Sequence, residues 1–288
     1  MDSTPQQFDP VKYKQTTHRQ WQEAAEAWYR WSPLLHRWLG NTTDKMLEMA
    51  GVSSGQKVLD IAAGAGEQSI TAARMVGPSG QVLATDISAN ILEYAKQMAI
   101  QNGISNIKTA VMDGENLSLE DETFDVVISR VGLIYFTDQQ KALKEMLRVL
   151  KSKGKIGAIV YSLPEKNTFF SIPVSIIRNR AQLSAPLPGQ PGPFSLSQKG
   201  VIENAFSMAG FKNVKSTLVN APLICKSAKE CLQFEKESFG ALHQMMSALS
   251  EPEKAALWDE IETALKPFET INGFEGPCEM LVAVGEKV

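Results

Sequence analysis

Acidic residues and glycines gather where a short apolar run ends, in the stretch Val58–Gln68 (VLDIAAGAGEQ). Gly64 and Gly66 allow the backbone to approach a ligand that a Cβ atom would block. Asp60 and Glu67 place a carboxylate on either side of these glycines. A pyrophosphate prefers the partial positive charge of a helix N-terminus, and a carboxylate at Glu67 would oppose it. The stretch therefore predicts a nucleotide-like ligand that carries positive charge.

Two further aspartates follow the next strand-like runs of the sequence. Asp86 comes about twenty residues after the glycines, where an acid accepts hydrogen bonds from both ribose hydroxyls; the alternative is a cap for a helix starting at Ser88. Asp113 can accept a hydrogen bond from an adenine amino group while Met112 packs on the adenine ring. With Asp60, these residues end three successive strands, and open α/β sheets bind ligands at the carboxyl ends of their strands. Together they predict a site for an adenosyl ligand.

Few residues could act as an acid or base toward a second substrate. His18 is our first candidate base, because its helix also carries Trp21 and Trp28 and could fold over the site. His243, in a later helix, is a second candidate, although an ordinary packed or surface role explains either histidine. Arg130 and Tyr135 are candidates to orient a hydroxyl or carboxylate. The tryptophans are either part of the ordinary core or an aromatic lid over an apolar pocket.

The elements that must position these residues alternate between strands and helices from Lys57 to Tyr161, as in a parallel α/β sheet. Helices with caps and apolar faces separate the runs, for example the one that starts after Ser88. The expected strands are Lys57–Ile61, Gln81–Thr85, Ile107–Val111, Phe124–Ser129 and Lys155–Tyr161.

The flanking regions have different patterns. Residues 8–50 are predicted to be helices broken at Pro33. The proline-rich stretch 164–196 is predicted to be an ordered loop or lid, and a strand is expected near Phe211–Val219. Helices that open at Ser227 and Ser250 would form a cap before a last strand, Glu279–Val284. The expected organisation is an N-terminal helical lid (1–50), an α/β core (51–161), a loop, helix and sixth strand (162–226), a helical cap (227–278) and the final core strand (279–288).

Bulk composition limits the class of protein. The 288 residues carry a formal net charge of -3, which gives no electrostatic case for nucleic-acid binding. No apolar run approaches the roughly 20 residues that span a bilayer, and the N-terminus lacks the pattern of a signal peptide. Three cysteines and three histidines in no metal-binding spacing predict no protein-bound metal. We expect a reduced, cytoplasmic enzyme with a small-molecule substrate.

The sequence resembles the class I S-adenosylmethionine-dependent methyltransferases, and most nearly the branch of the ubiquinone/menaquinone-biosynthesis C-methyltransferases. The resemblance covers residues 55–161. It rests on the stretches Val58–Gly66, Thr85–Ser88, Met112–Leu117, Phe124–Ser129, Gly132–Asp138 and Glu145–Leu150.

This resemblance implies a Rossmann-like, mostly parallel, seven-stranded sheet whose last strand is antiparallel, with S-adenosylmethionine as the cofactor. Ala62 stands where the family usually has its first glycine, a change that is tolerable if φ stays negative. Beyond Tyr161 the resemblance fades, so it does not identify the substrate. The predicted cofactor-binding residues are Asp60, Ala62, Gly64, Gly66, Asp86, Ile87, Met112, Asp113, Gly114 and Arg130, with Trp21 and Trp28 from the lid.

The predicted activity is methyl transfer to an oxygen or carbon of a small apolar or aromatic molecule. A dry pocket favours such a displacement when an anionic nucleophile neutralises a sulfonium. One alternative is an S-adenosylmethionine-binding enzyme that does not methylate, such as a cyclase. A less favoured one is a nicotinamide-dependent oxidoreductase, against which Glu67 and the missing third glycine of the dinucleotide fingerprint argue. Methylation of protein or nucleic acid is not favoured, because the sequence has neither a basic groove nor a motif typical of such enzymes.

Overall fold

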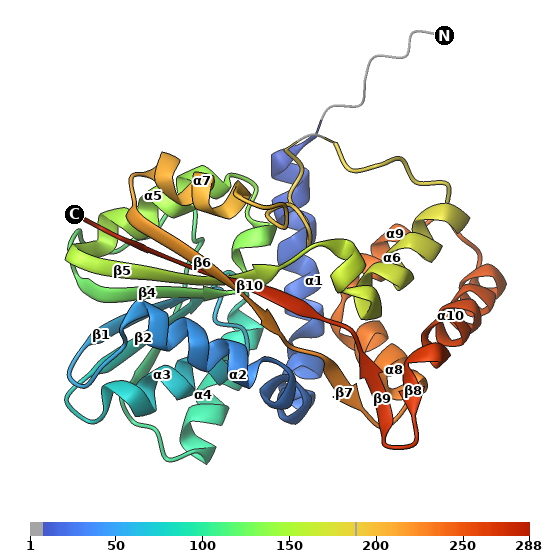
Figure 1. The fold of residues 1–288 in the computed structure, drawn as a ribbon, viewed down its shortest axis with the longest axis horizontal. Coiled ribbons are helices and arrows are strands. Elements are labelled where there is room, and N and C mark those ends of the chain that lie inside the picture. Colours follow the sequence, from blue (N-terminus) through green and yellow to red (C-terminus); the bar gives the residue numbers. More distant parts are fainter. Residues whose placement is uncertain (1–7, 188) are drawn as a thin grey trace, which may run out of the picture.

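The computed structural model describes residues 8–187 and 189–288. Its centre is a seven-stranded sheet with the order β3-β2-β1-β4-β5-β10-β6 (Figure 1). The strands are β1 (Lys57–Ile61), β2 (Gln81–Asp86), β3 (Ile107–Val111), β4 (Phe124–Arg130), β5 (Leu150–Tyr161), β6 (Lys212–Asn220) and β10 (Glu279–Glu286). All neighbours are parallel except β10, which is antiparallel to both β5 and β6. The predicted Rossmann-like fold with an antiparallel last strand is confirmed.

Helices cover both faces of the sheet, so its central strands are buried and almost continuously apolar. In Figure 1, α2, α3 and α4 lie on one face, and α5 and α7 lie on the other. Every residue of β1 after Lys57 is buried. These helices are α2 (Ser32–Ala50), α3 (Glu67–Val76), α4 (Ala89–Gln101), α5 (Gln139–Val149) and α7 (Val201–Ala209).

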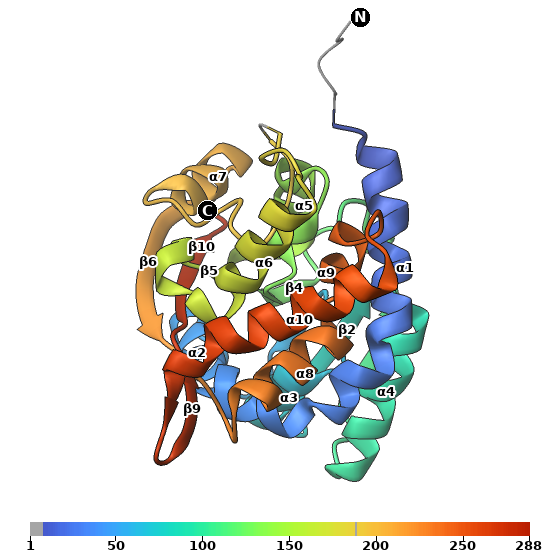
Figure 2. The same cartoon turned by 90° about the vertical axis from the view of Figure 1, so that its right-hand side faces the viewer.

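Helix α1 (Pro10–Arg30) stands between the sheet and the cap (Figures 1 and 2). As expected, the chain breaks before α2, whose first turn contains Pro33. Helix α1 packs on α4 of the core and on α8 and α9 of the cap. Among the described residues, no helix is both long and apolar enough to cross a membrane.

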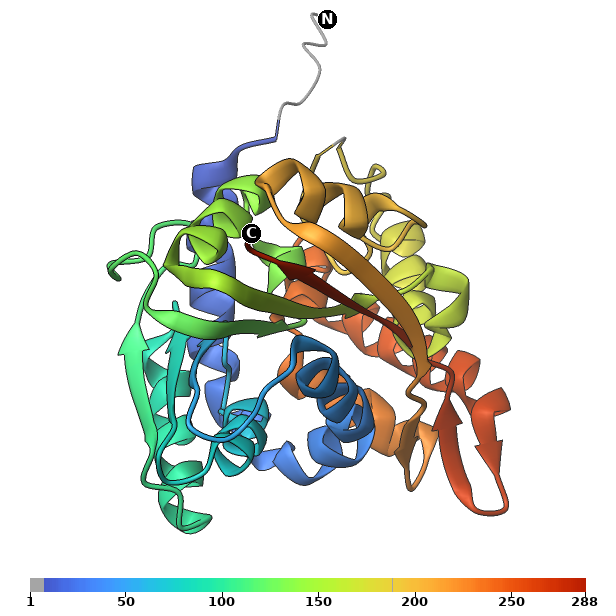
Figure 3. The same ribbon diagram turned by 60° about the vertical axis from the view of Figure 1, so that its left-hand side comes forward.

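The cap consists mainly of α8 (Ala228–Ser238), α9 (Gly240–Met245) and α10 (Glu251–Leu265), and both expected N-caps are present. Ser227 accepts from the backbone of Glu230, and Ser250 forms a full capping box with Glu253. A small sheet of β7 (Leu223–Cys225), β9 (Gly273–Gly276) and β8 (Glu269–Thr270) projects beside it, an element that the sequence analysis missed (Figure 3).

The proline-rich stretch corrects a second expectation. Much of its first half is a helix, α6 (Thr168–Arg180), which packs against α10 of the cap. Pro173 lies in the second turn of α6, and the helix is held by burial of Phe169, Phe170 and Ile177. Tertiary packing therefore overrides the local signal for a loop.

Candidate functional site

The ends of the first four strands open into a cavity that α1 covers. Its atoms surround about 1130 Å³ of space, part of it open to solvent. Most of the predicted site residues line it: His18, Trp21, Trp28, Ala62, Gly64, Asp86, Ile87, Met112, Asp113, Gly114, Arg130 and Tyr135. The cavity has an acidic half, formed by Asp86, Asp113, Glu115 and the loop 62–65, and an aromatic half, formed by Trp21, Trp28, Tyr135, Tyr161 and Phe239.

Strand order sets the order of the polar groups along the cavity. The sheet runs β3-β2-β1-β4, so Asp113, Asp86, the glycine loop and Arg130 follow one another along one edge. Neighbouring strands are about 4.8 Å apart, so the four positions form a row long enough for an extended nucleoside derivative. The sequence order alone does not give this row.

In the acidic half, the carboxylate of Asp86 is held in place by two backbone N–H groups. Its Oδ2 accepts from the Gly64 backbone N–H at 3.0 Å, and its Oδ1 accepts from the Ser88 backbone N–H at 2.9 Å. Burial raises the pKa of this carboxyl, while the backbone donors and His18 oppose that rise. Ser88 caps α4 with its own hydroxyl, so the predicted alternative role of Asp86 as the cap of this helix is wrong.

Asp113 lies in an ion-pair network that reaches across to the lid helix. Lys14 Nζ of α1 lies 2.7 Å from Asp113 Oδ2 and 2.6 Å from Glu115 Oε2. Glu115 is buried and also accepts from the Thr137 backbone N–H at 2.7 Å. Neither Lys14 nor Glu115 was predicted, because contacts across about a hundred residues leave no local signal in the sequence.

Asp60 does not line the cavity. Its side chain is fully buried, with Oδ2 accepting from the Ser69 hydroxyl and Oδ1 from the Gln68 amide. Burial is the main cause that raises the pKa of this carboxyl to about 7. The expectation that Asp60 faces the ligand with a full negative charge is therefore not met, because the carboxylate is turned toward the start of α3.

Glu67 does line the cavity, but its charge is already paired. Its Oε2 accepts from Arg130 Nη1, and its Oε1 lies 2.8 Å from His36 Nδ1. Arg130 Nη1 also donates to Thr43 Oγ1 at 3.0 Å. Since Glu67 is balanced by Arg130, the argument that its charge selects a cationic ligand is wrong as stated.

The glycine loop is held by backbone geometry as well as by the ligand site. Gly64 has φ +57° and faces the cavity, as predicted. Gly66 does not line the cavity; a Cβ there would lie 2.9 Å from the Ala95 Cβ, so this glycine permits close packing of α3 on α4. Ala62 has φ +58°, which contradicts the expected negative φ. Its methyl group fits because position 132 is glycine, where a Cβ would come within 2.3 Å of the Ala62 Cβ.

The aromatic half is a continuous set of ring contacts between the lid, the core and the cap. Trp21 lies 5.4 Å from Trp28 and 5.6 Å from Tyr135 between ring centroids, and Trp28 lies 5.8 Å from Phe239. The Trp28 indole N–H donates to the Ser238 backbone carbonyl at 2.9 Å, which fixes the lid to the cap. Of the two predicted roles for Trp21 and Trp28, the structure favours the aromatic lid, and Phe239 of the cap, which was not predicted, completes it.

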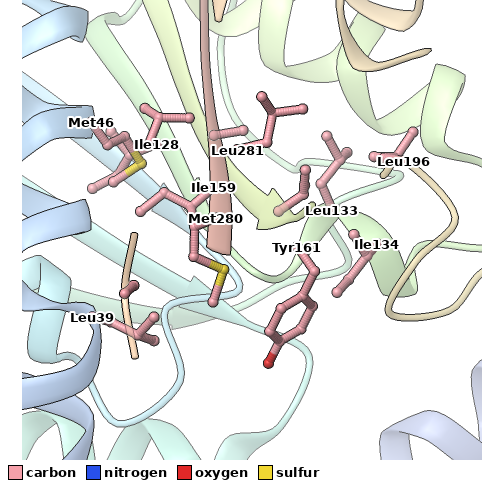
Figure 4. Close-up of a cluster of buried hydrophobic side chains, with 14 of the residues drawn as sticks. Leu39, Met46, Ile128, Leu133, Ile134, Ile159, Tyr161, Leu196, Met280 and Leu281 are labelled. Atoms are coloured by element: carbon pink, nitrogen blue, oxygen red, sulfur yellow. The ribbon is translucent and has the colours of Figure 1, made fainter. Parts of the chain in front are cut away.

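Two tyrosine hydroxyls belong to this half. Burial raises the pKa of both Tyr135 and Tyr161 above the ordinary value, so both phenols stay protonated. The described side chains offer the Tyr161 hydroxyl no hydrogen-bond partner. Figure 4 shows this hydroxyl pointing away from the apolar side chains around Met280 and Ile134. Tyr161 was missed because a tyrosine at the end of a strand is common.

The structure places the two candidate bases in different parts of the molecule. His18 lines the cavity on the side of Asp86, as predicted for a residue that could reach a bound ligand. His243 is exposed on the outer side of the cap, with Nε2 2.7 Å from the Lys236 carbonyl and its ring 5.6 Å from Trp258. The prediction of a catalytic His243 is wrong. In the described part of the chain, no group of His, Cys, Asp and Glu side chains is arranged to hold a metal ion.

Comparison with known proteins agrees with this geometry. The model of the ubiE/COQ5 methyltransferase family matches residues 35–174. The ubiquinone/menaquinone biosynthesis C-methyltransferase of Pseudomonas aeruginosa is 38% identical over 122 residues, which are 42% of this chain and 48% of that protein. The chain thus spans about half the length of the curated relatives it matches. The predicted resemblance to class I methyltransferases of the ubiquinone/menaquinone branch is confirmed.

Solved structures share the fold. The YcgJ protein of Bacillus subtilis has a TM-score of 0.57 at 19% identity, covering 86% of this chain and 98% of its own. SpnF, a (4+2)-cyclase, has a TM-score of 0.56 at 17% identity, covering 93% and 96%. Because one such neighbour is a cyclase, the fold alone does not distinguish methyl transfer from other chemistry.

Proposed function

We propose that this chain is an S-adenosylmethionine-dependent methyltransferase that acts on an oxygen or carbon of a small apolar or aromatic molecule. One observation carries the proposal: a row of polar groups suited to an adenosyl amino acid leads directly into a charge-poor aromatic half. The match of residues 35–174 to a methyltransferase family supports it.

The residues of the acidic half fit the cofactor. Asp113 and Met112 would hold the adenine, and Asp86 would accept from the ribose hydroxyls. Asp86 keeps its carboxylate at the cavity wall because two backbone N–H groups fix it there. Ile87 and Gly114 line the same space, where a Cβ on Gly114 would come within 2.7 Å of Phe136.

When bound, the cofactor supplies an electrophilic methyl group on a sulfonium. The chain's own part is to hold the acceptor in line with that group and to exclude water, and orientation of this kind contributes roughly 7–11 kcal/mol. The aromatic half does both, since Trp21, Trp28 and Phe239 close it without a charged side chain. The neutral hydroxyls of Tyr135 and Tyr161 would donate hydrogen bonds to an acceptor oxygen.

The charge-poor aromatic half also supports the proposed class of acceptor. Of the charged side chains that line the rest of the cavity, Lys14 is paired with Asp113 and Glu115, and Glu67 is paired with Arg130. These pairings leave little free counter-charge for an ammonium substrate, and the rings themselves offer no strong base to an amine. A phenol or enol that ionises readily needs neither. We therefore infer a small-molecule acceptor rather than a nucleic acid. The three buried free cysteines agree with a reducing, cytoplasmic location.

Two measurements test the proposal. A thermal-shift comparison should show stabilisation by S-adenosylmethionine and S-adenosylhomocysteine and none by NAD; the reverse pattern would overturn the cofactor assignment. Incubation with methyl-labelled S-adenosylmethionine and a panel of phenolic, enolic and amine acceptors should transfer label to oxygen or carbon. Turnover of an acceptor without label transfer would favour a non-methylating enzyme instead.

A further inference from the structure

Two cysteines lie side by side where the small sheet joins the cap. Cys225 is the last residue of β7, and Cys231 lies near the start of α8. Cys225 Sγ donates to the Ser227 carbonyl at 3.3 Å, and the Cys231 backbone N–H donates to the same oxygen at 3.0 Å. The two side chains contact each other, and both thiols are free. The turn that opens α8 therefore holds two thiols within reach of one another.

We propose that Cys225 and Cys231 form a reversible disulfide when a peroxide reaches the folded protein, and that Cys225 is the thiol that reacts first. The pair is thus a modification site, and its co-substrate is a small hydroperoxide. In reducing compartments a disulfide of this kind is transient and serves as a redox sensor rather than as a structural bond. The inference does not rest on the proposed function.

The two thiols differ in the way that the reaction requires, because a thiolate attacks a peroxide and a thiol does not. A hydrogen bond from the Cys231 thiol lowers the pKa of Cys225 below its ordinary value, although burial opposes this effect. The Cys231 backbone N–H, at the positive end of α8, acts in the same direction. Burial raises the pKa of Cys231 well above its ordinary value. Cys225 is therefore the nucleophile, and Cys231 is the protonated partner that resolves it.

The acids around the pair do little to oppose a thiolate at Cys225. Glu235 Oε1 lies 4.0 Å from Cys231 Sγ, one turn further along α8. Burial raises the pKa of Glu235 well above its ordinary value, so this carboxyl is neutral. The charge of Glu230 does oppose the thiolate, but Lys226 Nζ lies 3.7 Å from its carboxylate and offsets it.

Exposure also selects Cys225 as the first site of attack. It is 7% exposed, and its neighbours Ile224 and Lys226 both face solvent. Cys231 has no exposed surface. The third cysteine, Cys278, is 2% exposed, and burial raises its pKa to about 12. Cys278 therefore lacks both the thiolate and the access, and it is an internal control for the pair.

The proposed reaction consumes one peroxide and releases two waters. The Cys225 thiolate attacks a peroxide oxygen, so an S–O bond forms, the O–O bond breaks, and the departing hydroxide takes up the proton that the Cys225 thiol lost. The Cys231 sulfur then attacks the sulfur of this sulfenic acid. An S–S bond forms, and hydroxide leaves with the Cys231 proton as the second water. The two thiols are oxidised and the peroxide is reduced, and an external thiol reverses the reaction by exchange.

The place of the pair indicates which part of the molecule the modification would affect. Helix α8 packs on α1, and the Ser238 carbonyl at its end accepts from the Trp28 indole N–H. Phe239, the next residue, lines the aromatic half of the cavity. A bond that ties the start of α8 to β7 would therefore act on the contact between lid and cap, far from the acidic half.

The test uses the folded wild-type chain. The protein is treated with hydrogen peroxide at neutral pH, unfolded in N-ethylmaleimide, digested with trypsin and analysed by mass spectrometry without reduction. Trypsin cuts after Lys226 and Lys229, so the disulfide should join the separate peptides 216–226 and 230–236. Cys278 should carry the maleimide, and the pair should lose its thiols at least about tenfold faster than Cys278. Dithiothreitol before digestion should restore both thiols.

Three matched variants identify the order of the steps. Cys231→Ser should leave a sulfenic acid at Cys225 that dimedone traps, Cys225→Ser should form no disulfide, and Cys278→Ser should behave as wild type. The wild-type digest carries its own control in Cys278, so the test does not depend on the folding of any variant. Peroxide that leaves both thiols of the pair free, that oxidises Cys278 equally fast, or that joins Cys278 to either partner overturns the inference. Dimedone trapped at Cys231 of Cys225→Ser, with none at Cys225 of Cys231→Ser, overturns the assignment of the first thiol.

Discussion

The two halves of the cavity are built in different ways. The acidic half comes from short segments that directly follow β1, β2 and β3, and backbone hydrogen bonds fix its main carboxylate. The aromatic half joins α1, the segment after β4, the end of β5 and the cap, which are far apart in the sequence. The first half is therefore specified locally and suits a constant ligand. The second depends on how helices pack and is free to vary with the acceptor.

The largest expected effect is on stability and concerns Asp60, an acid next to the acidic half whose side chain is buried behind the cavity wall. Its carboxyl has a pKa of about 7 when folded, against an ordinary 3.8. Between these values the folded protein keeps a proton that the unfolded chain releases, so the free energy of unfolding falls by up to about 4 kcal/mol as the pH rises from 4 to 7.

Asp60→Asn should remove most of that dependence. Denaturant unfolding at several pH values, with the exposed Asp44→Asn as a control, measures it. Parallel pH curves for wild type and Asp60→Asn would show that Asp60 is ionised in the fold.

Asp86→Ala should affect cofactor binding, the function assigned to the acidic half, and leave the aromatic half unchanged. Loss of a carboxylate that accepts charged hydrogen bonds should weaken the binding of S-adenosylhomocysteine by at least about tenfold. Calorimetry of the variant beside Asp44→Ala checks this. Affinity unchanged from wild type would remove Asp86 from the cofactor site.

Tyr161→Phe probes the aromatic half without altering its packing. If the hydroxyl holds an acceptor oxygen, kcat/KM for the acceptor should fall by about tenfold while the affinity for S-adenosylhomocysteine stays constant. The control is Tyr94→Phe, whose ring stacks on Tyr29 outside the cavity. A fall in cofactor affinity with unchanged acceptor kinetics would reverse the assignment of the two halves.

The smallest expected effect is at Ala62. An alanine at φ +58° is strained, and Ala62→Gly should raise the free energy of unfolding by up to about 1 kcal/mol. Chemical denaturation of wild type and variant measures the difference. A clear loss of stability would show that the methyl contact with Gly132 outweighs the strain.

The sequence by itself determined the core strands and the acidic half except for Glu115. Alternating apolar runs fixed the strands of the core to within a few residues, because period and length are local properties. Asp86, Asp113 and Gly64 were identified as site residues because each lies at or within three residues of the end of a strand, and strand ends meet at one edge of the sheet.

Only the tertiary structure decided the direction and partners of individual side chains. Asp60 turns toward α3, Gly66 packs on α4, Arg130 neutralises Glu67, and His243 lies on the outer side of the cap. Lys14 and Phe239 reach the cavity through contacts over long sequence separations. Such contacts depend on how helices pack against one another, and local patterns carry no record of that packing.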